Sequence, residues 1–159
     1  MESLLLPSEP FQFLRPGVLR DGDLTVTLTS THLPNGAGIE VPTYCFMLSL
    51  RGGVTSVGHV HLRIGNTENL RLYQGHVGYG VDSGWRGRHY AERATRLILP
   101  LAKAHGINPV WITCDPGNIA SRRTCERLGG VFVEMVEVPS TALAYRFGAR
   151  KKCRYRLDV

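Results

Sequence analysis

The chain has 159 residues, of which 43% are hydrophobic and 20% charged, and its formal net charge is +6. This length suits one domain with a proper core, and the composition is that of an ordinary soluble globular protein. The start has a three-residue leucine run before Pro7 and no basic region, which argues against a signal peptide. No apolar run approaches the length of a membrane span. We therefore expect a single domain over residues 1–159 and no membrane partner.

The four cysteines lie far apart and contain no Cys-x-x-Cys pair. Metal sites place their cysteine and histidine ligands at short, fixed spacings. The pattern is typical of reduced cytosolic thiols, so it predicts a cytoplasmic protein with no metal and no disulfide framework. The cysteines are Cys45, Cys114, Cys125 and Cys153.

The positive charge is concentrated near the C-terminus. Between Arg146 and Val159, six basic residues and one acid leave an excess of +5, against +1 for the remaining chain. Three interpretations stay open: a solvated edge strand, attraction of an anionic cofactor or acidic substrate, and a nucleic-acid surface. The solvated strand is the ordinary interpretation of such a run, and nucleic acid is the least favoured partner.

The first half of the chain predicts strands rather than helices. Residues 1–22 contain three prolines and no helical period, so they are expected to form an irregular lead-in. Alternating and β-branched residues predict strands over 23–30, 43–50, 56–64 and 74–81. Loops are expected between them, one rich in Pro, Asn and Gly over 32–42 and a polar one over 65–72.

A helix should begin near Tyr90, after a tight basic turn. Its apolar residues recur at helical spacing, Pro100 should kink it, and His105-Gly106 resembles a C-terminal cap. The apolar stripe consists of Tyr90, Ala94, Leu97, Ile98 and Leu101.

The second half of the chain alternates strand and helix. Residues 110–114 form a short buried strand, and residues 119–128 a second helix, which Asn118 caps and Gly129-Gly130 ends. Residues 131–138 and 144–157 are expected as two long strands, which makes 146–159 a basic C-terminal strand. This order predicts an α/β (α+β) fold with a central mixed, mostly antiparallel sheet flanked by helices.

Two motifs in this half resemble those of the GNAT family of acyl-CoA-dependent acetyltransferases. The family pattern Arg/Gln-x-x-Gly-x-Gly/Ala corresponds to residues 86–91, here Arg-Gly-Arg-His-Tyr-Ala. The second element is an Asn, a small or polar residue three positions later and a closing Gly, here Asn118, Ser121 and Gly129. The form Asn-Ile-Ala-Ser-Arg is most similar to branches that acetylate ribosomal proteins and small molecules. The resemblance covers roughly residues 74–135.

The resemblance implies an N-acetyltransferase that moves an acetyl group from acetyl-CoA to a primary amine by direct transfer in a ternary complex. A helix N-terminus carries unsatisfied N–H groups and a partial positive charge, which suits the pyrophosphate. The peptide-like pantetheine arm would pair with a strand edge where the family's sheet splays. The implied cofactor-binding residues are Tyr79, Gly80, Val81, Arg86, Gly87, Arg88, His89, Tyr90, Ala91, Asn118 and Ser121.

Two positions depart from the family pattern. His89 replaces the first glycine of the phosphate motif, where glycine lets the backbone approach a phosphate closely, so its side chain must turn outward. Cys125 stands where many members have a tyrosine that protonates the departing thiolate. A thiol can serve as that acid, and a buried packing role is the alternative.

The general base that accepts the amine proton has several candidates. His76 lies on the strand expected to line the reaction centre, and histidine titrates near working pH, so we predict a catalytic role for it. His59 and His61 share a strand face and are expected to be structural or to line the substrate site. Glu134 and Glu137 are weaker candidates, and no base adjoins Cys114 or Cys125 that would favour a covalent intermediate.

Two other functions remain open. A catalytically silent acyl-CoA-binding module would account for His89 and the missing tyrosine, and a basic nucleic-acid- or ribosome-binding protein for the C-terminal charge. The acceptor is a small-molecule or peptide amine that the sequence does not specify. Because the segment before residue 43 is short and broken by prolines, we expect a shallow acceptor pocket or one completed by a second subunit in a homodimer.

Overall fold

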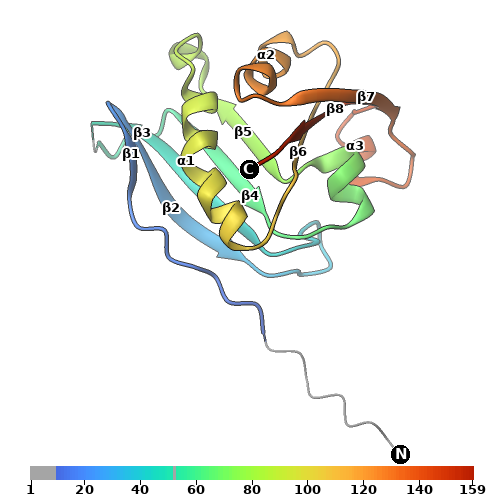
Figure 1. Cartoon of the computed structure of the whole chain (residues 1–159), viewed down its shortest axis with the longest axis horizontal. Helices are drawn as coiled ribbons and strands as arrows, with labels where there is room; N and C mark the ends of the chain where they lie inside the picture. The colour runs from blue at the N-terminus through green and yellow to red at the C-terminus, as the bar shows by residue number, and fades with distance from the viewer. Residues whose placement is uncertain (1–9, 52) are drawn as a thin grey trace, which may run out of the picture.

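The frame of the protein is a pair of antiparallel sheets (Figure 1). The computed structural model describes residues 10–51 and 53–159. One sheet has five strands in the order β1-β2-β3-β4-β5, and the other has three in the order β6-β8-β7. Their bounds are β1 (Leu19–Asp21), β2 (Leu24–His32), β3 (Thr43–Leu50), β4 (Gly58–Arg63), β5 (Val77–Val81), β6 (Val110–Cys114), β7 (Val131–Glu137) and β8 (Lys151–Leu157).

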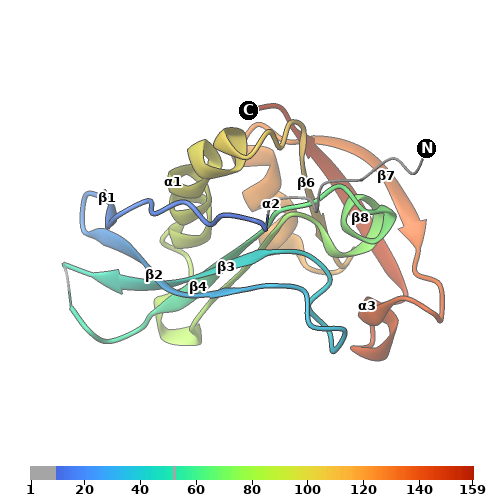
Figure 2. The same cartoon turned by 90° about the horizontal axis from the view of Figure 1, so that it is seen from below.

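The helices connect these strands. Helix α1 (Tyr90–Ala104) follows β5, α2 (Ile119–Arg127) follows β6, and the short α3 (Leu143–Arg146) lies between β7 and β8. Two short turns, η1 (Leu70–Gln74) and η2 (Ser83–Trp85), precede and follow β5. Figure 2 shows α1 on one face of the five-stranded sheet, and among the described residues no helix covers the other face of β2 to β4. No helix in the described part of the chain is long and apolar enough to cross a membrane.

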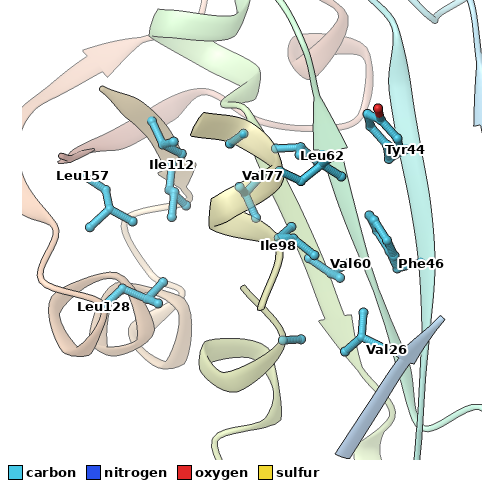
Figure 3. Close-up of a cluster of buried hydrophobic side chains, with 14 of the residues drawn as sticks. Val26, Tyr44, Phe46, Val60, Leu62, Val77, Ile98, Ile112, Leu128 and Leu157 are labelled. Atoms are coloured by element: carbon cyan, nitrogen blue, oxygen red, sulfur yellow. The ribbon is translucent and has the colours of Figure 1, made fainter. Parts of the chain in front are cut away.

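The core forms where α1 packs on the sheet (Figure 3). Ile98 is fully buried on α1, against side chains such as Val60 and Leu62 from β4. The predicted stripe is confirmed for Ala94, Ile98 and Leu101, which are all buried, and the helix runs through Pro100. The predicted cap is confirmed, since Gly106 adopts a φ of +76° and the Ile107 amide bonds to the Ala102 carbonyl.

The α/β fold with a mostly antiparallel sheet flanked by helices is confirmed, but the sheet is divided. Among the described residues, β5 pairs only with β4, and β6 pairs only with β8. The two sheets part between β5 and β6 and leave a gap, over one face of which α1 and α2 meet. We call this gap the split.

Two predictions about the chain ends are wrong in part. The lead-in does not extend to residue 22, because β1 pairs with β2 from Leu19↔Val26 to Asp21↔Leu24; residues 1–9 lie outside the described residues. The C-terminal strand begins at Lys151, not at 144 or 146, since residues 143–146 form α3. The predicted loop over 65–72 also differs from the structure, because its last residues belong to the helical turn η1. Short helical turns such as these carry too few residues to show a period.

Strand β8 is also not an edge strand. It lies between β6 and β7, and Arg154 in its middle is only 7% exposed. The Arg154 guanidinium stacks on the Trp111 ring at 4.2 Å and donates to Glu134 Oε1 at 2.7 Å. Lys152 pairs with Asp115 at 3.0 Å, and Arg156 with Asp158 at 3.0 Å. Half of the six C-terminal cations are therefore ion-paired within the fold.

Candidate active site

The free edge of β5 faces the split. The His76 carbonyl accepts from the Arg63 amide at 2.7 Å, and the Asp82 amide donates to the Val57 carbonyl at 2.9 Å. Both bonds therefore point toward β4. Because backbone groups alternate in direction along a strand, Val77, Tyr79 and Val81 turn their N–H and C=O groups toward the split. Of the predicted pantetheine-binding residues, Tyr79 and Val81 thus supply the open edge, whereas Gly80 faces β4.

His76 joins the two sheets at the closed end of the split. Its backbone N–H donates to the Trp111 carbonyl at 2.7 Å, and its Nδ1 accepts from the Trp111 amide at 2.9 Å. Because Nδ1 accepts, the proton is on Nε2, which donates to the Gly65 carbonyl at 2.9 Å. Burial lowers the pKa of His76. Nδ1 thus helps to hold β5 beside β6, Nε2 bonds to the loop after β4, and the predicted catalytic role of His76 stays a prediction.

The N-terminus of α1 presents the predicted phosphate site. The first intrahelical bond runs from the Arg93 amide to the His89 carbonyl, and no side chain caps the helix. The amides of residues 90–92 therefore have no acceptor within the helix, which is the condition for anion binding. Tyr90 contributes only its backbone, because its side chain is 4% exposed and packs in the core.

The loop before α1 adopts the glycine-like backbone of the family motif even where glycine is replaced. Gly87 has a φ of +83°, and His89 has a φ of +59° with a ψ of 25°. His89 therefore occupies the left-handed region at a cost of roughly 1 kcal/mol or more. Its side chain is 56% exposed and turned outward, as predicted, with Nδ1 3.8 Å from Glu92 Oε2.

The two predicted arginines differ in their present contacts. Arg86 Nε donates to the Val81 carbonyl at 2.9 Å, so this side chain folds back onto the edge of β5. The Arg88 guanidinium lies over the Trp85 ring at 5.3 Å, on the surface of the loop. The Arg86 bond therefore occupies a backbone carbonyl of the free edge.

The N-terminus of α2 lies on the other side of the split. Asn118 caps this helix as predicted, with its Oδ1 accepting from the Ser121 amide at 3.1 Å. The Ser121 hydroxyl lies 2.8 Å from Tyr79 Oη, so the predicted residues of β5 and α2 come into direct contact. Cys125 Sγ lies 3.8 Å from the same Tyr79 hydroxyl.

Burial fixes the protonation of this cluster. Burial raises the pKa of the Tyr79 hydroxyl, so it stays protonated. The buried Cys125 thiol donates a hydrogen bond to Cys114, which lowers the pKa of Cys114 to about 7 and raises that of Cys125. Tyr79 and Cys125 are both protonated at neutral pH, and their raised pKa values make both weak acids. The sequence analysis considered Tyr79 only for its backbone and missed this side-chain contact, because no linear motif joins residues 79, 121 and 125.

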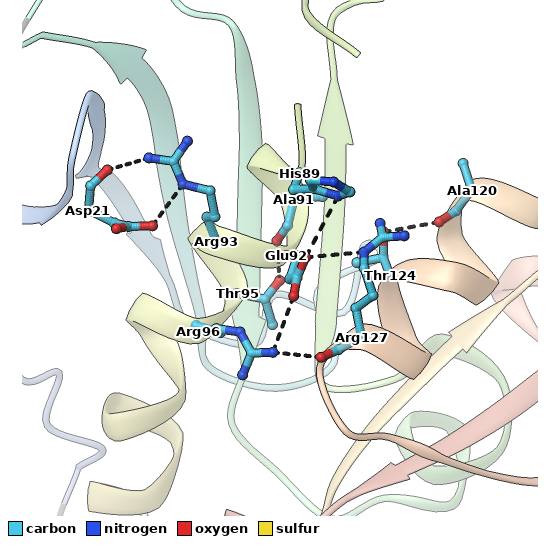
Figure 4. A network of polar contacts seen from close by, with 10 residues as sticks. All are labelled: Asp21, His89, Ala91, Glu92, Arg93, Thr95, Arg96, Ala120, Thr124 and Arg127. Carbon is cyan, nitrogen blue, oxygen red and sulfur yellow. Dashed lines mark hydrogen bonds and ion pairs between the residues drawn. The ribbon is translucent and has the colours of Figure 1, made fainter. Parts of the chain in front are cut away.

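A network around Glu92 links the helices on either side of the split (Figure 4). Glu92 Oε1 pairs with Arg96 at 3.2 Å, and Oε2 pairs with Arg127 of α2 at 3.1 Å. Arg96 also donates to the Arg127 carbonyl at 2.6 Å. Since α1 packs on the five-stranded sheet and α2 on the three-stranded one, the network connects the two halves of the fold.

An open cleft lies at η1 and α3, away from the contact between α1 and α2. It has an outer compartment of about 590 Å³ and an inner one of about 380 Å³. Asn69, Tyr73, Gln74 and Leu143 line both compartments. Residues 36–40 line the outer compartment, so the short proline-broken segment contributes one wall of an open cleft. The sequence missed this cleft, since its walls come from three separate loops. Within the described residues, no three His, Cys, Asp or Glu side chains are grouped so as to hold a metal.

The sheet is split, the N-terminus of α1 is uncapped, and the Asn-capped α2 lies opposite. This arrangement is the one that the motifs indicated, that of an acyl-CoA-dependent transferase. The family model of the GNAT acetyltransferase domain matches residues 22–131, more than half of the chain. The protein therefore belongs to the GNAT acetyltransferase family and is an acetyltransferase.

Solved structures share this fold. The ribosomal-protein-S5-alanine acetyltransferase from Vibrio fischeri superposes with a TM-score of 0.64 at 12% identity, covering 89% of this chain and 96% of that one. The microcin C7 self-immunity acetyltransferase MccE, solved with acetyl-CoA and AMP, has a TM-score of 0.56 at 14% identity, with 74% and 61% covered. A GNAT acetyltransferase from Bacillus anthracis has a TM-score of 0.54 at 19% identity, with 72% and 65% covered. The chain thus spans less than two thirds of the last two. No curated protein matches the sequence.

Proposed function

We propose that the protein transfers an acetyl group from acetyl-CoA to a primary amine by direct transfer in a ternary complex. One observation carries the proposal: the unpaired amides at the start of α1 follow, after η2 and the basic loop, the strand whose free edge faces the split. A phosphate acceptor and a strand edge for a peptide-like arm are thereby arranged in the order that coenzyme A requires.

The cofactor would bind along this line. The amides of residues 86–91 would hold the pyrophosphate, with Arg86 and Arg88 adding charge, and Asn118 and Ser121 would border the arm on the α2 side. The pantetheine amides would pair with the exposed groups of Tyr79 and Val81. For that pairing, Arg86 leaves the Val81 carbonyl and turns to the phosphates, which would couple cofactor entry to a change in the loop.

The transfer step needs an oxyanion donor and two proton transfers. The Tyr79 backbone N–H points into the split, where it would stabilise the tetrahedral oxyanion; removing one such donor costs about 2.7–4 kcal/mol in other enzymes. The amine attacks the thioester carbon and loses its proton, and the C–S bond breaks to release the thiolate. Cys125 remains our candidate for protonating that thiolate, with Tyr79 Oη 3.8 Å from its sulfur as the neighbouring protonated group.

Direct transfer is favoured over an acyl-cysteine intermediate. Cys125 holds its proton because burial and Cys114 raise its pKa, so it is a poor nucleophile. His76, our candidate base, would have to release the Trp111 amide from Nδ1 before it could accept a proton, because Nε2 already carries one. The amine would otherwise pass its proton to water in the open cleft.

A silent acyl-CoA-binding module is the second candidate, because His89 keeps a side chain at the phosphate loop. The nucleic-acid alternative is less favoured, since three of the six C-terminal cations have acidic partners. A cytoplasmic location belongs to the same proposal, supported by four free cysteines. A homodimer remains a prediction of the sequence.

Calorimetric titration with acetyl-CoA tests the proposed function. We expect binding by the wild type and a loss of about tenfold or more in Arg86→Ala and Asn118→Ala, since each removes a polar contact worth on the order of 1.4 kcal/mol. Arg20→Ala is the matched control, because Arg20 is exposed on β1 at the far edge of the sheet. Absence of binding by the wild type would refute the proposal, and binding without turnover of any amine would leave the silent module.

A further inference from the structure

Arg63, at the end of β4, carries a charge that the fold leaves without an acidic partner. Its side chain is half-buried, and Nη1 donates to the carbonyls of Gln74 at 3.4 Å and Gly75 at 3.2 Å. No ion pair of the described residues includes it, and its Nε and Nη2 form no hydrogen bond among them. A guanidinium removed from water costs free energy unless an anion meets it.

Gly78 has no side chain, and the Arg63 guanidinium occupies the space that this leaves. A Cβ atom at position 78 would be 3.0 Å from Arg63 Nη2 and 3.3 Å from Nη1. The guanidinium therefore lies against the backbone of β5 at Gly78, on the face of the sheet opposite the Tyr79 side chain. A larger residue at 78 would displace it, so the glycine and the arginine act together.

Arg63 also lines the inner compartment of the cleft, which straddles the split. Arg63 comes from the five-stranded sheet, whereas Asp115 and Lys152 border the compartment from the three-stranded side. Asp115 is occupied, because its Oδ1 pairs with Lys152 Nζ at 3.0 Å. Arg63 is thus the uncompensated charge of a compartment that adjoins the proposed reaction centre.

We propose that Arg63 binds a carboxylate of the acceptor, so the acceptor is a small amine with a carboxylate a few bonds from its amine, such as a free amino acid. The inference rests on the proposed function. A guanidinium binds a carboxylate through parallel N–H donors, and such charge-assisted bonds are roughly twice as strong as neutral ones. With the carboxylate on Nη2 beside Gly78, the amine lies toward the split, where the thioester would be.

The charges in the cleft favour a free amino acid over a polyamine or a peptide. A polyamine would bring only positive charge to Arg63, and a peptide N-terminus has an amide where an amino acid has its carboxylate. Glu40 and Glu68 line the outer compartment, and neither forms an ion pair with Arg63. These two carboxylates would instead meet a polar or cationic distal group of the acceptor.

The test compares matched acceptors that differ only in the anion. Acetylation of free amino acids and of their carboxamides is followed by mass spectrometry of the product, with polyamines and short peptides in the same panel. We expect each accepted amino acid to exceed its amide by roughly 10- to 100-fold in kcat/KM, mainly through KM for the acceptor. Arg63→Gln should bring the pair within about twofold, while Arg63→Lys, which keeps the charge, retains part of the preference.

Two controls separate this inference from the proposed function. Arg20→Gln, an exposed arginine on β1, should keep the full preference, and acetyl-CoA titration of Arg63→Gln should match the wild type. If the wild type uses amino acid and carboxamide equally well, the inference is overturned. This comparison needs only the wild type, so it holds even if Arg63→Gln does not fold. Turnover of polyamines or peptides alone overturns the inference while the proposed function stands. Absence of acetyl-CoA binding refutes the proposed function and the inference with it.

Discussion

The two sides of the split are built in different ways. On the α1 and α2 side, the phosphate loop is one continuous segment, and Asn118 and Ser121 belong to a second, so local backbone rules determine most of the geometry. On the cleft side, the walls come from residues 36–40, 68–74 and 139–149, together with Arg63 and Lys152. Substitutions in the cleft can therefore change which acceptor binds, while the sequence of the cofactor side stays constant. This division suits one acetyl donor and varied acceptors.

His76 belongs to both sides, so its removal should have the largest effect. His76→Ala leaves the Gly65 carbonyl and the Trp111 amide without partners in a site that is 1% exposed, and it opens a cavity. We expect a loss of about 3–5 kcal/mol in the free energy of unfolding, measured by urea denaturation. A loss below about 1 kcal/mol would show that His76 does not hold the sheets together.

The conservative variant His76→Gln separates positioning from proton transfer. A glutamine side chain can supply an acceptor and a donor but not a base that titrates near neutrality. If His76 only positions the strands, this variant should recover part of the stability and most of kcat, with an unchanged pH profile. If His76 is the general base, kcat should fall and the profile should lose its acidic limb.

Acidification should weaken the five-stranded sheet next, through His61 on β4. Burial, together with His59 and Arg63, lowers the pKa of His61 to about 4 from its ordinary 6.5. Between those values the unfolded chain binds a proton that the folded protein does not, so stability falls as the pH drops from 6.5 toward 4. We expect a loss of about 1–2 kcal/mol between pH 7.5 and 5 from His61, since solvent reduces the full value.

Denaturation at the two pH values measures this effect, with His61→Gln as the matched variant. Burial lowers the pKa of His76 and of His105 as well, so both act in the same direction and remain in the variant. The difference between the wild type and His61→Gln therefore isolates one residue. Equal pH dependence in both proteins would contradict the depressed pKa of His61.

Sequence reasoning succeeded where the controlling interactions are local. The Asn118 cap, the apolar stripe of α1, the Gly106 cap and the outward turn of His89 all depend on residues a few positions apart. It failed for Arg154. The run of cations around this residue indicated a solvated edge strand, but its partners Glu134 and Trp111 come from other strands. The contact of Tyr79 with Ser121 and Cys125 arises only when the two sheets come together, and that of Arg63 with Gly78 only when β4 pairs with β5.

The smallest effect should come from His89, the departure from the family pattern in the phosphate loop. His89 holds a left-handed backbone that glycine adopts without strain, and its exposed ring makes only a long contact with Glu92. His89→Gly should therefore leave the free energy of unfolding within about 1 kcal/mol of the wild type, since relieved strain and added chain entropy oppose each other. Acetyl-CoA affinity should rise by up to about tenfold, because the backbone can then approach the phosphates more closely. His89→Ala serves as the control, since it removes the ring but keeps the Cβ and its strain. If affinity falls in both variants, the imidazole itself is a phosphate ligand, and the cofactor side then depends on a side chain as the cleft side does.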